Sequence, residues 1–242
     1  TSLKQSSQVF TDPPIWWPSP VRWENYLEAL GTQNFPFFRL LRNTLFYVVV
    51  STVGITGSSL LVAYGFARIN FWGREVLFGI TLSTMMLPGI VTLIPTYVLF
   101  RWFGWVGSYA PLIVPCFFGN AFHIFLLRQF LMGIPWDLTD AARVDGASEH
   151  YILLRVIVPL VKPALLVVAI FHFMWAWNDF MGPLIYLDNA RQYPLVLGLS
   201  NFQTQHSILW NLIMCAAMAT TLPLILLFFI AQRYFIEGVV LT

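Results

Sequence analysis

The sequence predicts an all-α fold, a polytopic bundle in which five helices span a membrane. Of its 242 residues, 58% are hydrophobic and only 10% are charged, a composition too apolar for a soluble domain. Long uncharged runs recur along the chain, and about twenty apolar residues are enough to cross the hydrocarbon core. A single charged segment in the second half interrupts this pattern. We therefore expect one membrane domain covering residues 1–242.

Residues 1–36 are predicted to form a surface segment before the first span. Prolines and tryptophans crowd into residues 13–23, a composition that disrupts regular structure and suits a membrane interface. A short helix is expected over 24–30, ended by Gly31. The tryptophans could instead form an aromatic site that stacks on sugar, and this alternative stays open.

Apolar stretches long enough to cross a membrane cover residues 43–67, 76–100, 108–127, 164–187 and 208–231. Pro88-Gly89 and Pro95 predict kinks in the second stretch, because a proline removes a backbone hydrogen bond. In the first stretch, Gly54 and Ser58 lie four residues apart and predict a face that packs closely on another helix. Residues 188–207 are polar and predict a loop.

The charged segment, 137–163, carries a spaced pattern. It contains Asp140-Ala141-Ala142, then Gly146 after three residues, then Val156-Ile157-Val158-Pro159 after nine more. The residue types predict a short helix, a glycine break and a second helix.

The ends of these two helices follow from particular residues. Asp137 is expected to cap the first helix, with Asp140 completing a capping box. Gly146 permits the left-handed turn that ends it. Ser148 is expected to cap the second helix, and the prolines at 159 and 163 to end or kink it.

This pattern resembles the Glu-Ala-Ala loop of bacterial ABC importer permeases: Glu-Ala-Ala, three residues, Gly, nine residues, Ile, any residue, Leu, Pro. The departures are Asp140, Val156 and Val158, and each keeps the charge sign or the apolar character. An ordinary amphipathic loop of some other transporter is the alternative.

Further short matches resemble the carbohydrate-uptake branch of these permeases, in particular subunits similar to the G-type permease of the maltose transporter. They are Trp23-Glu24-Asn25-Tyr26, Arg42-Asn43-Thr44-Leu45, Trp177-Asn178-Asp179-Phe180 and Tyr193-Pro194-Leu195. The opening Thr1-Ser2-Leu3-Lys4 resembles residues that follow a first span in such proteins, so the resemblance implies six spans in the whole protein.

The resemblance implies an inner-membrane assembly of two permeases, two cytoplasmic ATP-binding subunits and an extracytoplasmic solute-binding protein. The loop 128–162 would then be cytoplasmic and would contact an ATPase subunit, whereas 1–36 would be extracytoplasmic. Lys and Arg are split almost evenly between the two sides, so the motif alone decides this orientation. The residues expected to make the coupling contact are Asp140, Ala141, Ala142, Asp145, Gly146 and Pro159. For Asp140, a plain helix-start carboxylate is the alternative.

Polar and aromatic residues in or near the spans are candidates for a solute path. They are Asn120, Trp175, Asn178, Asp179 and Asn211. The amides and the carboxylate suit a hydroxyl-rich solute, and an indole can stack on a sugar face. Hydrogen bonding between helices is the alternative for Asn120 and for His123. By resemblance, 189–205 could contact the binding protein, and a partner permease could make most solute contacts.

Several other functions are disfavoured. The chain has no Gly-x-x-x-x-Gly-Lys-Ser/Thr phosphate loop and no metal-ligand spacing among its four histidines. We therefore expect no catalytic residue, cofactor or metal, and a net charge of +2 does not suggest nucleic acid. Remaining alternatives are a secondary transporter, a membrane scaffold, or an ABC permease for glycerol phosphate, amino acids or peptides. Phosphate cargo would favour Arg or Lys in the spans, which contain none.

Overall fold

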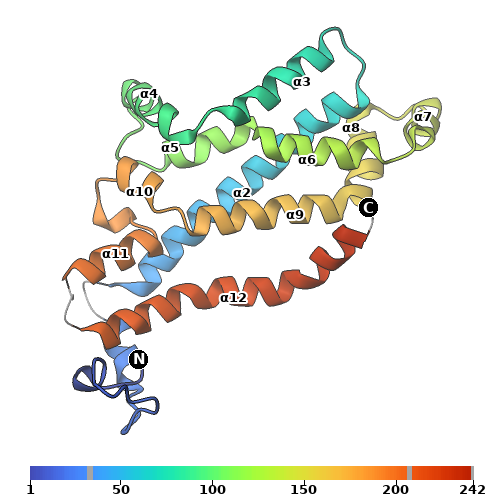
Figure 1. The fold of residues 1–242 in the computed structure, drawn as a ribbon. Helices are drawn as coiled ribbons and strands as arrows, with labels where there is room; N and C mark the ends of the chain where they lie inside the picture. Colours follow the sequence, from blue (N-terminus) through green and yellow to red (C-terminus); the bar gives the residue numbers. More distant parts are fainter. Residues whose placement is uncertain (32–34, 206–208, 241–242) are drawn as a thin grey trace. The chain divides into compact units, whose positions relative to one another are not determined.

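The computed structural model describes residues 1–31, 35–205 and 209–240 (Figure 1). Within these ranges the regular elements are all helical, which confirms the predicted all-α fold. The α-helices are α1 (Glu24–Gly31), α2 (Phe37–Arg68), α3 (Arg74–Ser83), α4 (Gly89–Trp102), α5 (Ala110–Ile113), α6 (Ala121–Met132), α7 (Trp136–Val144), α8 (Glu149–Tyr151), α9 (Val158–Trp177), α10 (Met181–Tyr186), α11 (Leu195–Gln205) and α12 (Trp210–Val240).

Contacts group the chain into two compact units. The first unit comprises residues 1–48 and 176–230, and the second comprises 49–175 with the end of α12. The charged segment 137–163 lies wholly in the second unit.

Four helical stretches are long and apolar enough to cross a membrane. They are Phe37–Arg68, Ala110–Met132, Glu149–Trp177 and Trp210–Phe229. A fifth candidate is the pair Arg74–Met86 and Gly89–Trp102, which is bent by 101°. The kink predicted at Pro88-Gly89 is therefore a sharp break, because Leu87 before the proline takes an extended backbone. Pro95, in contrast, lies inside α4.

The span after the charged segment begins and ends earlier than predicted. It runs continuously over Glu149–Trp177, so the helix does not stop at Pro159. A π-helical turn, Ile152–Ile157, comes directly before this proline. The wider turn makes room for the proline ring, which would otherwise clash with the carbonyl four residues earlier. It also accommodates the backbone N–H that proline lacks. Pro163 is likewise inside α9.

Two predicted boundaries in the last third of the chain are corrected. The predicted loop 188–207 contains helix α11, because Leu195, Leu197 and Phe202 are buried and packing overrides the polar composition. Residues 206 and 207, with His206, lie outside the described residues. The helix expected to end at 231 continues to Val240 as α12.

The second unit is held together by a hydrophobic core on α2, α6 and the helix over 149–177. Leu60, Tyr64, Leu127, Leu131 and Ile157 are among its buried members.

The small face of α2 packs closely, as predicted. A Cβ on Gly54 would lie 2.8 Å from the Phe117 ring. One turn further along, the Ser58 hydroxyl donates a hydrogen bond to the Cys116 carbonyl at 3.0 Å.

Gly198 in α11 tests the packing of the first unit. Its Cα faces Leu40, which is fully buried, and an added Cβ would lie 2.5 Å from Leu40 Cδ1. We predict that Gly198→Ala lowers the stability by about 1–3 kcal/mol through overpacking. Gly57→Ala has open space and is expected to stabilise α2 by about 0.5–1 kcal/mol. Thermal unfolding in detergent compares them, and equal shifts for the two variants would contradict this account.

Candidate coupling site and solute pocket

The motif forms a compact projection that we call the knob, residues 133–148. It lies between the spans that end at Met132 and begin at Glu149, so it is shorter than the predicted loop 128–162. Figure 1 shows α7 as a separate short helix beyond the end of α6.

The end of α7 is built as predicted. Gly146 has φ +80°, and its N–H bonds to the Arg143 carbonyl at 3.0 Å while the Ala147 N–H bonds to the Ala142 carbonyl at 3.0 Å. This pair of bonds is a Schellman motif. Ser148 then caps the next helix by accepting the Tyr151 N–H at 3.3 Å, as expected.

The predicted capping box at the start of α7 is wrong. Pro135 is the N-cap residue, with an extended backbone and no side-chain cap, so α7 begins before Asp137 can cap it. The Asp140 carboxylate instead accepts a hydrogen bond from Arg143 Nη1 at 3.0 Å.

A chain of hydrogen bonds ties the knob to α2. Arg143 Nε donates to Glu149 Oε1 at 2.8 Å, and the Tyr64 hydroxyl donates to Glu149 Oε2 at 2.6 Å. The hydrogen bond to the Glu149 carboxylate raises the pKa of the Arg143 guanidinium. Arg143 therefore remains charged, and the Glu149 carboxylate of α8 joins it to Tyr64 of α2.

Arg68, the last residue of α2, makes a second attachment. Its side chain is 2% exposed, and Nη2 donates to the carbonyls of Leu131, in the last turn of α6, and of Ile134, just after that helix. The guanidinium also lies over the Trp136 ring, 4.7 Å from its centre. A cation at a helix C-terminus satisfies carbonyls that have no partner within the helix.

The predicted coupling residues are divided between the tip and the base of this structure. Asp140, Ala141, Asp145 and Gly146 are exposed on the knob, while Ala142 is half-buried against the core. Pro159 is exposed on α9, outside the knob. Val144, which sequence reasoning did not select, is 87% exposed and adds an apolar side chain to the tip.

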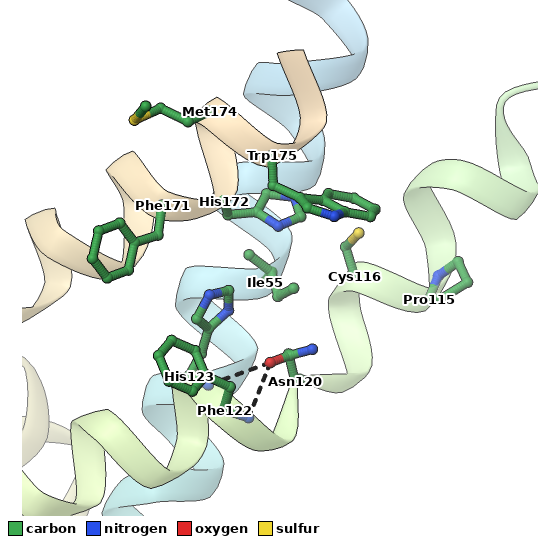
Figure 2. A pocket seen from close by; sticks show the side chains of 11 residues that line it. Ile55, Pro115, Cys116, Asn120, Phe122, His123, Phe171, His172, Met174 and Trp175 are labelled. Atoms are coloured by element: carbon green, nitrogen blue, oxygen red, sulfur yellow. Dashed lines mark hydrogen bonds between the residues drawn. The ribbon is translucent and has the colours of Figure 1, made fainter. Parts of the chain in front are cut away.

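A second feature of this unit is a pocket of about 690 Å³. Figure 2 shows its lining side chains, which come from α2, the turn at 114–118, α6 and α9. Asn120 caps α6, since its Oδ1 accepts the N–H groups of Phe122 at 3.0 Å and His123 at 3.3 Å. Its own N–H donates to Ser59 Oγ of α2 at 3.2 Å, so Asn120 also bonds between helices.

Two histidines that sequence reasoning left out of the path line the pocket. His123 and His172 are 7% and 4% exposed, and their ring centres are 6.1 Å apart. Among the described residues, His123 Nδ1 and His172 Nε2 have no hydrogen-bond partner. An unsatisfied buried polar group costs about 1–3 kcal/mol, so the pair requires an explanation. Their position in uncharged stretches was the available sequence signal.

The other predicted path residues belong to the first unit. Asp179 accepts hydrogen bonds from the Tyr47 hydroxyl at 2.9 Å and the Gly182 N–H at 3.0 Å, and burial raises the pKa of its carboxyl. Asn211 accepts the Ser6 hydroxyl at 3.0 Å, while Asn178 is exposed. Only Asn120 and Trp175, from the predicted path residues, line the pocket.

No cluster of three or more His, Cys, Asp or Glu side chains in the described part of the chain is arranged to hold a metal ion.

Comparisons with known proteins agree across nearly the whole chain. The family described as "binding-protein-dependent transport system inner membrane component" matches residues 55–240. The chain is 31% identical to the arabinooligosaccharides transport system permease protein AraQ of Bacillus subtilis, over 98% of this chain and 84% of the relative. It is 31% identical to the sn-glycerol-3-phosphate transport system permease protein UgpE of Pectobacterium atrosepticum, over 97% and 85%.

A solved structure shares the fold. A chain from the crystal structure of a bacterial ABC transporter involved in the import of the acidic polysaccharide alginate superposes with a TM-score of 0.86 at 24% identity. The match covers 97% of this chain and 87% of that one.

The Tyr64–Glu149 bond gives a test of how the knob is held. Tyr64→Phe removes one hydrogen bond, worth about 1 kcal/mol, and should speed amide hydrogen exchange in residues 136–148 about fivefold. Tyr151→Phe, at a side chain that is 57% exposed, is the matched control and should leave exchange unchanged. Equal protection in both variants would show that this bond does not hold the knob.

Proposed function

This chain belongs to the family of inner-membrane components of binding-protein-dependent transport systems, and on that premise we propose that it is an ABC importer permease for a neutral sugar or oligosaccharide. ATP hydrolysis in such a system belongs to a partner subunit, so this chain supplies a path and a mechanical link. The partners are a second permease, ATP-binding subunits, a solute-binding protein and the surrounding lipid.

The proposed mechanical coupling rests on the contrast between the exposed tip of the knob and its anchored base. Asp140, Ala141, Val144 and Asp145 are exposed and available to a cytoplasmic ATPase subunit. The base is tied to α2 by the Arg68 and Tyr64 side chains. A displacement of the tip would therefore move the spans, which is what alternating access between two states requires.

The cargo assignment rests on the charge of the pocket. Relatives include permeases named for arabinooligosaccharides and for sn-glycerol-3-phosphate. A phosphate is recognised by Arg or Lys, and the described residues lining the pocket include neither. A neutral sugar is thus favoured over glycerol phosphate.

Orientation follows from the ATPase contact. With the knob in the cytoplasm, residues 1–36 and the stretch 189–205 are proposed to be extracytoplasmic, where a solute-binding protein could contact them. Pro159 is proposed to act from α9 by shaping the helix after the knob rather than by touching the ATPase.

Gly146 tests the coupling role. A β-branched residue at its positive φ costs about 1–2 kcal/mol. This cost lowers the population of the folded turn by about five- to thirtyfold. We predict that Gly146→Val leaves the complex assembled but lowers the solute imported per ATP hydrolysed by a similar factor. The measurement is uptake and ATP hydrolysis in proteoliposomes containing all subunits.

A matched control exists at the end of α4. Gly104 has φ +69°, and its N–H and that of Trp105 bond to the carbonyls of Arg101 and Phe100, the same Schellman motif. Gly104→Val carries equal strain away from the knob and should leave coupling intact. Normal uptake by Gly146→Val, or an equal loss in both variants, would refute the coupling role.

A further inference from the structure

We infer that the pocket in Figure 2 is a binding site for one neutral sugar unit of the cargo, with His123, His172 and Asn120 as hydrogen-bond partners and Trp175 as a stacking surface. The inference rests on the proposed function and extends it by naming the residues that recognise the solute.

The two histidines have unmet hydrogen-bonding capacity. His123 Nδ1 and His172 Nε2 are buried and have no partner in the described part of the chain, whereas buried polar groups in proteins are nearly always paired. A neutral imidazole has one donor and one acceptor nitrogen. A sugar hydroxyl can donate and accept, so it fits either nitrogen in either tautomer.

An aromatic surface lies beside the two histidines. Trp175 is 61% exposed, and its ring centre is 5.5 Å from that of His172. Figure 2 shows the indole next to the His172 ring. An exposed indole beside polar groups offers an apolar face to the C–H face of a sugar ring while the imidazoles reach its hydroxyls.

Size and charge define the ligand class. The volume of about 690 Å³ lies within the range of about 300–1,000 Å³ usual for small-molecule sites. Among the described lining residues there is no Asp, Glu, Lys or Arg. An anionic ligand would therefore lose its hydration without gaining a counter-charge, which disfavours a phosphate ester.

Position along the helices supports a role in transport. α6 runs over Ala121–Met132, so Asn120 and His123 lie about 14–18 Å along the axis from the end at the knob. The hydrocarbon core is about 30 Å thick, which puts the pocket inside the span. Lipid chains cannot satisfy the imidazole nitrogens there, whereas water or a polar solute can.

Cys116 lines the same pocket and provides a direct readout. In the assembled transporter, alkylation of Cys116 by N-ethylmaleimide would be followed by mass spectrometry without nucleotide. The probes are a mixture of arabinotriose, maltotriose and cellotriose at millimolar concentration and, separately, sn-glycerol-3-phosphate. We expect the neutral sugars to slow alkylation and the phosphate ester not to.

Variants separate recognition from mere packing. His172→Leu and His123→Leu should raise the sugar concentration needed for half-protection about tenfold. His172→Gln, which keeps a hydrogen-bonding side chain, should recover much of this loss. Trp175→Leu should also weaken protection, and Trp175→Phe, which keeps an aromatic ring, should weaken it less. Thr221→Val is the control, because the Thr221 hydroxyl bonds to Ala217 of its own helix.

Protection by the phosphate ester alone, by neither probe, or equally in wild type and both His→Leu variants would overturn the inference. The assay needs no ATP hydrolysis, so its result is independent of coupling. A failure of the proposed function would instead show as protected Cys116 without ATP-driven uptake.

Discussion

The buried guanidinium of Arg68 fixes how the membrane helices meet the knob. It is the last residue of α2, yet its hydrogen bonds go to carbonyls at the end of α6, and its charged face lies over Trp136 at the start of α7. One side chain thus joins the ends of two spans to the first turn of the motif helix. Removing it would take a side-chain donor away from the Leu131 and Ile134 carbonyls at a buried position, where unpaired polar groups are costly.

The helices attached to the knob are also those that line the pocket. α2 contributes Tyr64 and Arg68 at the knob and Ile55 at the pocket, and α6 bears Asn120 and His123 at its opposite end. The helix over 149–177 runs from the Glu149 ion pair to the histidine and indole of the pocket. Because helices transmit displacement as rigid elements, motion imposed at the knob would reach the pocket, the proposed solute site, along these three helices.

Some local features of this chain were predictable, whereas the pairing of residues on different helices was mostly not. The left-handed turn at Gly146 and the Ser148 cap depend on backbone preferences of a few neighbouring residues, so the pattern alone was sufficient. The π-turn before Pro159 was missed because a proline signals an interruption without saying how it is accommodated. The pairing of His123 with His172 depends on which helices pack together, and one sequence carries no such register.

The central claim is that the knob is the contact through which ATP drives transport. The most direct measurement is disulfide or bifunctional cross-linking from Ala141→Cys and Val144→Cys, both at exposed tip positions, to the ATP-binding subunit in membranes with and without ATP. Trp102→Cys at the end of α4 is the control. We expect a cross-link from the tip positions alone, with a yield that changes with ATP. No cross-link from either tip position, with all subunits present, would contradict this claim.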